Sequence, residues 1–466
     1  MPSNPIPNLG ADPLTATGPF VPRGVALALC CVVLIAPSVA SATEWSAIPS
    51  ISLKLQHDDN LLLTTGPHQG VTGLTVAPRI KLAAQQENWD ISGSAELRGR
   101  RYWGQNGLNR NDQIYNLSSL FRTQRTTWQL GGGYAKESVI ASATFNPDIG
   151  LVSALTQRIT RNVNPSWTWQ MTERTQLELN FQSSLVSYQN GLASDLVNYS
   201  SRDGGATLLY QWSPRNQLTA ELDRSYFKVP QTGLSQLGQP AYSVVSGGLL
   251  SLSPNPRELS NISTTDSLVL GWSHIFSQTL SGNIAIGARR TDSNSVIETC
   301  TSSTPPSLYF INGQYVGIGT CTGTTDATFS QTSSGYLYNA GLDKQFQLTH
   351  VTLSVGRQIS PGGVGTQILV DTAAIGINRK LSDRLNAGLS LAGYRVRAIG
   401  TSPLPFTDRN YFNASANLRW RWTRRLTVEG DYLYIRQQFV GTTATAHDNV
   451  IYAKLDYRWF GYTLSR

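Results

Sequence analysis

Polar and apolar residues alternate along most of the chain beyond residue 43. Between Arg409 and Arg425 the odd and even positions separate into an apolar set, Phe412, Ala414, Ala416, Leu418, Trp420 and Trp422, and a polar set, Tyr411, Asn413, Ser415, Asn417, Arg419 and Arg421. A period of two predicts a β-strand whose two faces meet different surroundings. The same alternation recurs at 177–182, 218–223 and 426–434. Soluble sandwiches alternate as well, so strand length and spacing must decide the fold class.

The alternating segments are long. Most run roughly 10–15 residues, the length that a tilted strand needs to cross hydrocarbon, whereas strands of soluble proteins cluster near 5–6 residues. We expect eighteen strands, with sixteen as the alternative count, near residues 47–57, 71–84, 88–103, 113–123, 126–138, 156–170, 175–188, 198–212, 217–228, 265–276, 279–291, 335–346, 349–359, 366–380, 384–398, 410–422, 426–438 and 447–460.

The connections between these segments are of two kinds. Short ones repeat a pattern of a large apolar residue, a Ser or Thr, polar or basic residues and a Leu, as in 169–177, 212–218, 276–280, 381–385 and 422–426. The long, irregular ones are 104–112, 139–154, 229–263, 293–334 and 400–408. Short periplasmic turns and long extracellular loops are typical of outer-membrane barrels. The sequence therefore predicts an all-β protein with one transmembrane antiparallel β-barrel over residues 43–466.

The N-terminal residues predict secretion. An apolar run from Gly24 to Ala36 follows Arg23 and precedes a small-residue site ending at Ala42. Such a run is short for a transmembrane helix but typical of a signal peptide, so we expect residues 1–42 to be a signal peptide with a loose leader. Since a closed barrel satisfies its backbone groups in lipid, we expect the mature chain in the outer membrane of a Gram-negative bacterium.

Composition is consistent with this class. Only 14% of the 466 residues are charged, against roughly 25% in an average soluble protein, and Gly (41), Tyr (19) and Trp (11) are frequent. The formal net charge of +8 is a modest basic excess. A basic excess favours anionic partners without by itself predicting nucleic-acid binding, and we expect none.

Charged residues of both signs occupy the polar faces of the predicted strands. A Lys or Arg on the lipid face at mid-bilayer would cost roughly 2–4 kcal/mol, so we expect these side chains to line the lumen. They can form a polar conduit that favours anions, or simply a solvated wall, and pairs of opposite charge could also seal it. The predicted lumen-lining residues are Asp90, Glu96, Arg98, Arg100, Glu178, Glu221, Asp223, Arg419, Arg421, Glu429, Asp431, Lys454, Asp456 and Arg458.

Cys300 and Cys321 are the two cysteines that remain after the predicted cleavage. In an oxidising compartment we expect them to form a disulfide, which would stabilise the loop 293–334 by around 3 kcal/mol. A second candidate site, His57 to Asn60, could bind a divalent ion or serve a hydrolase, but a solvated loop-end patch is the simpler interpretation. No hydrolase, zinc or phosphate-loop motif occurs. We therefore expect no enzymatic activity, no metal and no cofactor.

Three features resemble a known family: the segment Leu53 to Leu62 after the signal, the repeated Trp/Phe-Ser/Thr-x-Arg turns, and the segment Tyr411 to Arg436. They resemble outer-membrane β-barrel proteins encoded in exopolysaccharide operons and, more broadly, β-barrel porins. The resemblance implies a passive channel that serves export or surface passage of an exopolysaccharide. A small-solute porin and a closed-lumen structural or hydrolase barrel are the alternatives. The implied partners are lipopolysaccharide, an anionic polysaccharide, periplasmic export components and the barrel assembly machinery.

Overall fold

The computed structural model describes most of the chain from Thr43 onwards. The described residues are 43–104, 106–139, 156–189, 196–230, 241–245, 248–251, 256–303, 307–311, 314–318, 321–363, 365–399, 408–440 and 444–465. Side chains are described for fewer of them, because those of 106, 241–259, 297–326 and 465 are not. The predicted signal peptide, residues 1–42, lies outside the described residues and stays a prediction.

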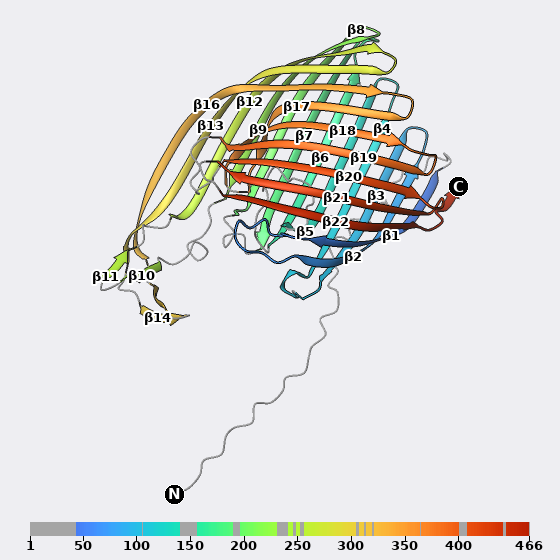
Figure 1. Ribbon diagram of the computed structural model, residues 1–466. Helices are drawn as coiled ribbons and strands as arrows, with labels where there is room; N and C mark the ends of the chain where they lie inside the picture. Colours follow the sequence, from blue (N-terminus) through green and yellow to red (C-terminus); the bar gives the residue numbers. More distant parts are fainter. Residues whose placement is uncertain are drawn as a thin grey trace. The chain divides into compact units, whose positions relative to one another are not determined.

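Eighteen antiparallel strands form the barrel (Figure 1). They are β1 (Glu44–Asp58), β2 (Val71–Gln85), β3 (Trp89–Tyr102), β4 (Arg110–Arg122), β5 (Thr126–Ser138), β6 (Gln157–Gln170), β7 (Thr175–Gln189), β8 (Tyr199–Ser213), β9 (Asn216–Val229), β12 (Pro256–Ser277), β13 (Leu280–Ser303), β16 (Cys321–Gln345), β17 (Thr349–Pro361), β18 (Gln367–Lys380), β19 (Leu385–Ala398), β20 (Arg409–Arg421), β21 (Leu426–Phe439) and β22 (Thr445–Arg458). The predicted fold class and count are thereby confirmed.

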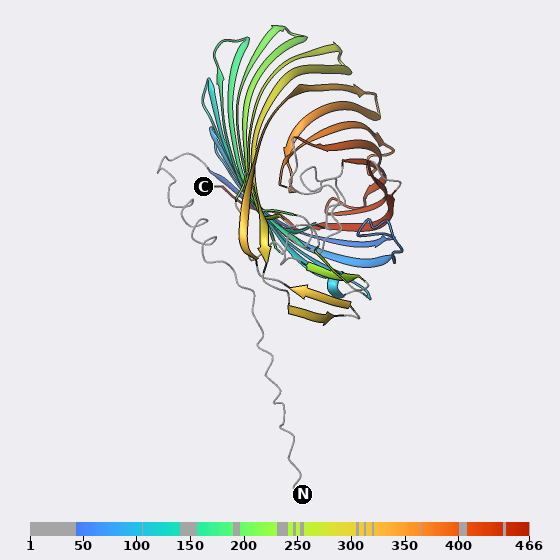
Figure 2. The same ribbon diagram turned by 90° about the vertical axis from the view of Figure 1, so that its left-hand side faces the viewer.

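The sheet closes on itself. β1 pairs with β2 on one side and with β22 on the other, where Leu53 lies opposite Leu455. A short strand, β23 (Tyr462–Ser465), continues beyond β22 and pairs with the start of β1. Figure 2 looks at the end of the barrel that carries the long connections, which we call the loop end; the opposite end is the turn end. Closure removes both sheet edges, as a membrane barrel requires.

The repeated turn motif has one structural explanation. The Ser or Thr hydroxyl oxygen accepts hydrogen bonds from backbone N–H groups two and three residues later, a local turn that side-chain hydroxyls favour. Thr423 accepts from Arg425 and Leu426 at 3.2 and 3.0 Å. Equivalent bonds are made by Thr123, Thr172 and Ser382. The motif therefore fixes the register of successive hairpins at the turn end.

Three strands are much longer than the sequence predicts. β12, β13 and β16 have 22, 24 and 25 residues. The prediction of irregular loops over 229–263 and 293–334 was therefore wrong for 256–263, 293–303 and 321–334. In sequence these segments are rich in Ser and Thr and do not alternate. A strand end that extends beyond the hydrocarbon needs no apolar face. Four short strands, β10 (Ala241–Val245), β11 (Gly248–Ser251), β14 (Ser307–Ile311) and β15 (Gln314–Ile318), form a separate small sheet.

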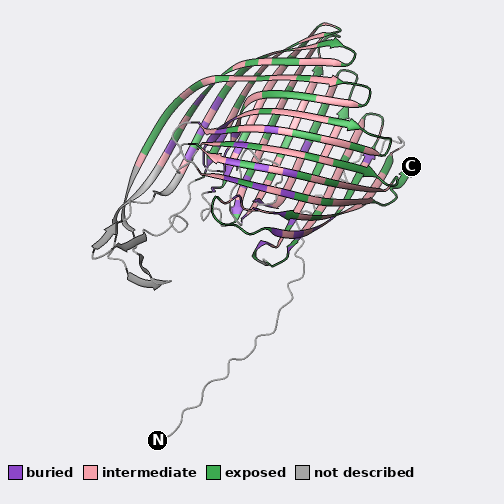
Figure 3. Ribbon diagram, in the orientation of Figure 1, coloured by how far each residue is buried: buried purple, intermediate pink, exposed green. Residues whose placement is uncertain are grey.

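The outer face of the barrel is apolar. Along β12 and β13 the exposed fractions of Leu268, Leu270, Ile284 and Ile286 are 46%, 54%, 50% and 64%, and Leu270 lies directly opposite Ile286. Buried residues instead gather towards the loop end (Figure 3). Among the described residues, no helix is long and apolar enough to cross a membrane.

The hairpin β17–β18 folds into the barrel at the loop end. β13 and β16 stay paired out to Ser303 and Cys321, but β16 pairs with β17 only from Tyr338 to Gln345. Beyond Arg357, towards the loop end, β17 therefore no longer pairs with β16. The backbone N–H of Val197 donates to the carbonyl of Gly363 in the hairpin tip at 2.8 Å. These residues belong to connections that are far apart in the sheet order.

The folded-in hairpin packs on the interior face of β12. Asn261 Nδ2 donates to the Gly365 carbonyl at 2.8 Å. The Gln367 side-chain oxygen accepts from Ser263 and Thr265 at 2.9 and 2.8 Å, and its nitrogen donates to Ser225 at 3.3 Å. Asn261, Ser263, Thr265 and Gln367 are at most 3% exposed. Here the barrel wall is two layers thick, and we call this region the double layer.

Candidate functional site: the interior of the barrel

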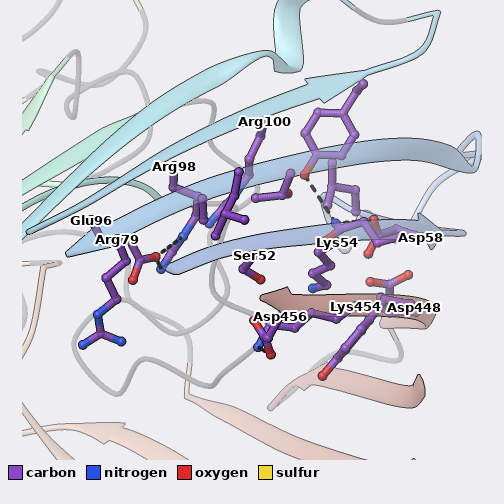
Figure 4. Close-up of a pocket in the computed structure, with 18 of the residues that line it drawn as sticks. Ser52, Lys54, Asp58, Arg79, Glu96, Arg98, Arg100, Asp448, Lys454 and Asp456 are labelled. Atoms are coloured by element: carbon purple, nitrogen blue, oxygen red, sulfur yellow. Dashed lines mark hydrogen bonds and ion pairs between the residues drawn. The ribbon is translucent and has the colours of Figure 1, made fainter. Parts of the chain in front are cut away.

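A charged cavity of about 440 Å³ lies between β1, β2, β3 and the last strands (Figure 4). The alternation of each strand places its charged residues on one face and its apolar residues on the lipid side. Nine charged residues line the cavity: the cationic Lys54, Arg79, Arg98, Arg100 and Lys454, and the anionic Asp58, Glu96, Asp448 and Asp456. The predicted residues Glu96, Arg98, Arg100, Lys454 and Asp456 are thus brought together in one place.

Ion pairs hold most of these side chains in position. Arg98 pairs with Glu96 at 2.7 Å and Lys454 with Asp456 at 3.0 Å, each two residues away on the same strand. Arg100 pairs at 3.2 Å with Asp112, whose side chain is fully buried. The ammonium group of Lys54 lies 4.1 Å from the ring centroid of Tyr452. Five cations and four carboxylates therefore line this wall, and Asp112 adds a fifth carboxylate behind Arg100.

A second cavity, of about 720 Å³, lies against β8, β9 and β12. Its wall carries the carboxylates of Asp203, Glu221 and Asp223, and β17 supplies Ser354 and Gln358 on another side. Glu221 and Asp223 were predicted from the sequence. Arg224 and Arg357 also line this cavity, so it carries three carboxylates and two guanidiniums, against four carboxylates and five cations in the first cavity.

The other predicted residues are distributed around the barrel. Arg419 on β20 pairs with Glu429 on β21 at 2.9 Å, and Arg421 donates to the backbone carbonyl of Asp383 at 3.3 Å. Asp90 pairs with Arg122 at 2.6 Å. The remaining three lie opposite polar partners in the sheet: Glu178 opposite Thr168 and Thr207, Asp431 opposite Asn417 and Tyr452, and Arg458 opposite Ser50. Their role in conduction stays a prediction.

Sequence reasoning missed several cavity residues. Lys54, Asp58 and Arg79 line the first cavity, and Asp203 the second. Each occupies the polar set of its own alternating strand, so applying the parity rule to every strand would have found them. The folded-in hairpin was also missed. Its signal is the run Ile368-Leu369-Val370, which interrupts the alternation as strands covered on both faces do.

The candidate site at His57 to Asn60 forms hydrogen bonds across the seam of the barrel, the line along which β1 pairs with β22. The backbone N–H of Asn60 donates to Asp448 at 2.9 Å, and that of Asn449 donates to Asp59 at 2.7 Å. Burial disfavours the charged form of Asp59, but hydrogen bonds from Asp448 and Asn449 outweigh burial and lower its pKa below the ordinary value. The segment thus joins the β1–β2 connection, residues 59–70, to β22. No group of three or more metal-ligating residues occurs within the described ranges.

The predicted disulfide concerns side chains outside the described set. Backbone pairing puts Cys300 of β13 opposite Thr324 and Cys321 of β16 opposite Ser303. The disulfide therefore stays a prediction.

No protein-family model and no curated protein matches the chain. Among solved structures, it is similar to OccAB2 of Acinetobacter baumannii, with 11% identity over 89% of this chain and 98% of that one and a TM-score of 0.42. It is similar to OccK2 (OpdF) of Pseudomonas aeruginosa in complex with glucuronate, with 9% identity, coverage of 90% and 98%, and a TM-score of 0.42. It is also similar to a bacterial polysaccharide outer membrane secretin, with 9% identity, coverage of 91% and 100%, and a TM-score of 0.34.

Similarity this low gives no information about a transported solute. What decides the location is the barrel itself, because a closed sheet with an apolar outer face and a charged interior satisfies its backbone and side chains only in a bilayer. The chain is an outer-membrane β-barrel of a Gram-negative bacterium. The implied link to exopolysaccharide operons finds no support in the comparisons.

Proposed function

We propose that this outer-membrane barrel is a passive channel for small hydrophilic solutes and that its first cavity favours anions. The observation that carries the proposal is the set of nine charged side chains around that cavity, five of them cationic, inside a wall with an apolar exterior. Charged groups that line a water-filled pore select permeating ions by the sign of their field.

Two features of the interior favour small solutes over a polymer. The clefts of about 440 and 720 Å³ along the interior wall are of the size that binds small molecules. The folded-in hairpin also narrows the loop end. Exopolysaccharide export is the second candidate, and it is supported by the sequence resemblance alone. A lumen closed by the double layer would instead make the barrel structural.

Single-channel recording in planar bilayers distinguishes the three. A small-solute channel conducts, and small sugar acids permeate it; an exporter conducts, and an anionic oligosaccharide blocks the current for long periods. A barrel that inserts, shifts its gel migration on heating and never conducts would contradict both channel functions.

Charge reversal tests which side chains line the path. Replacing Arg419 and Arg421 by Glu (Arg419→Glu/Arg421→Glu) reverses two cationic positions on the interior face of β20. We expect the reversal potential in a KCl gradient to shift towards cation selectivity. The matched control is Arg290→Glu, because Arg290 pairs with Asp292 and is 67% exposed on the opposite face of β13. If the double variant keeps the wild-type selectivity, these arginines do not line the path.

A further inference from the structure

Arg289 carries a buried charge without a carboxylate partner among the described residues. It lies on the interior face of β13 and is 8% exposed. Its Nη1 donates to the Thr291 hydroxyl at 3.0 Å, but its Nε has no hydrogen-bond partner. The guanidinium lies 3.1–3.3 Å from the position that a Cβ of Gly335 would occupy, so the glycine leaves room for it. A buried guanidinium of this kind is costly unless an anion compensates it.

The neighbouring charges increase the imbalance. Arg357 on β17 and Arg397 on β19 both pair with Asp371 on β18, the latter at 2.7 Å. The positive charges of Arg357 and Arg397 also act on Arg289. Three guanidiniums therefore share one directly paired carboxylate, which gives this cluster of four side chains a formal net charge of +2. The carboxylates of Asp203, Glu221 and Asp223 line the second cavity together with Arg357, but none of them pairs with Arg289 in the described part of the chain. The Nε of Arg397 also lacks a hydrogen-bond partner.

The double layer creates this cluster. β13 is separated from β17 and β19 in the sheet order, and the cluster forms only because the hairpin β17–β18 folds against the interior face of β12 and β13. Without an anion, repulsion between Arg289 and the hairpin arginines opposes that fold. An oxyanion accepts hydrogen bonds from several guanidiniums at once and neutralises their charge.

We propose that Arg289, Arg357 and Arg397 form an anion-binding site that takes a small oxyanion, a phosphate or a carboxylate, and thereby fastens the hairpin β17–β18 to the barrel wall. Binding at this site does not depend on conduction, so it goes beyond the proposed channel function. The anion is a resident structural ligand or the acidic group of a solute, and both sources share the same chemistry.

The test measures stability against anion concentration. The folded barrel in detergent is titrated with inorganic phosphate or with acetate at constant ionic strength, and the midpoint temperature of the heat-induced gel shift is followed. We expect an upward shift of roughly 2–4 °C at saturation, because a ligand that binds only the folded state stabilises it. A shift with phosphate alone assigns the site to inorganic oxyanions, and a shift with both anions extends it to carboxylates.

Two variants sharpen the test. Arg289→Gln removes the uncompensated charge, so it should abolish the anion-dependent shift and keep a midpoint at or above that of the wild type in anion-free buffer. Arg290→Gln, the adjacent residue on the opposite face, should keep the full shift. Absence of any shift in the wild type, or an unchanged shift in Arg289→Gln, would overturn the proposal. Conductance of the same samples reports on the channel function separately.

Discussion

The wall at β20 and β21 and the double layer at β12 and β18 use the same kind of strand in opposite ways. On β20, polar residues such as Asn413 and Asn417 face the interior while Phe412 and Leu418 are 40% and 47% exposed on the other side. In the double layer, polar residues on the interior face of β12 are fully covered and bond to Gln367. The polar residues of the alternating pattern therefore face the water-filled interior in one region and form buried hydrogen bonds in the other.

The difference predicts how strongly single substitutions in each region change the stability of the barrel. A polar group on the single-layer wall exchanges its protein partners for water at little cost. In the double layer a polar group is out of contact with water. If its hydrogen-bond partner is removed, the group stays buried and unsatisfied, and its full desolvation penalty is lost from the stability. Stability should therefore depend far more strongly on single residues in the double layer than on matched residues of the single-layer wall.

The largest effect is expected from a charge placed in the double layer. Val370 is 1% exposed and packs with Ile368 and Val396. Val370→Asp would bury an unpaired carboxylate, and we expect a loss of at least about 3 kcal/mol in the free energy of unfolding, measured by urea titration in lipid vesicles.

The control for this change lies two residues along the same strand. Thr372 and Val370 both line the second cavity, but Thr372 is half-buried whereas Val370 is 1% exposed. Thr372→Asp should therefore cost less than about 1 kcal/mol, because the carboxylate reaches water. Equal losses of unfolding free energy in the two variants would show that Val370 is not shielded from water by the packing of the hairpin.

A smaller effect is expected from Gln367→Leu. This change removes the acceptor for Ser263 and Thr265 and the donor to Ser225. Ser263 then loses this acceptor, whereas Thr265 keeps its hydrogen bond to Thr291 at 2.8 Å. An unsatisfied buried hydroxyl costs about 1–3 kcal/mol, and the added apolar side chain offsets part of this cost. Urea unfolding measures the loss, and the hairpin should also become easier to cleave with protease.

Gln358→Leu is the matched control, because Gln358 lies on β17 of the same hairpin but is exposed to the second cavity. We expect a change within about 0.5 kcal/mol. A destabilisation as large as that of Gln367→Leu would contradict the special role of the buried hydrogen bonds.

The smallest effect concerns pH at the seam. The folded-state pKa of Asp59 lies below its ordinary value, since hydrogen bonds from Asp448 and Asn449 outweigh the opposing effect of burial. Its contribution is therefore present above about pH 4, the ordinary pKa, and is lost as the pH falls through the lowered one. The gel-shift midpoint should drop less between pH 5 and pH 3 in Asp59→Asn than in the wild type. An identical drop would exclude Asp59 as a source of acid sensitivity.

Much of the wall could be predicted from the sequence. A strand in contact with lipid on one face and water on the other must alternate, so β20 and β21 were predicted to within about two residues, with their Thr423 turn. The charged sets on these faces followed from the same rule. The local pattern is sufficient to predict a strand wherever its two faces contact only lipid and water.

The double layer could not be predicted in this way. Its contacts join Ser263 to Gln367, more than a hundred residues apart, and no local pattern encodes that pairing. The extended ends of β13 and β16 lack alternation because they lie beyond the hydrocarbon, so the sequence predicts loops there. Arg289 looks like any interior arginine in the sequence, and only the nearby hairpin makes its charge unusual.

The pairing of Leu53 with Leu455 has a consequence for biogenesis. β1 is synthesised first, yet β22, one of its two neighbours in the sheet, is synthesised near the end of the chain. Until β22 pairs with β1, both keep an open hydrogen-bonding edge that could pair with another chain. Closure of the barrel therefore needs the last long strand, and a chain truncated before β22 should keep an open edge and aggregate more readily.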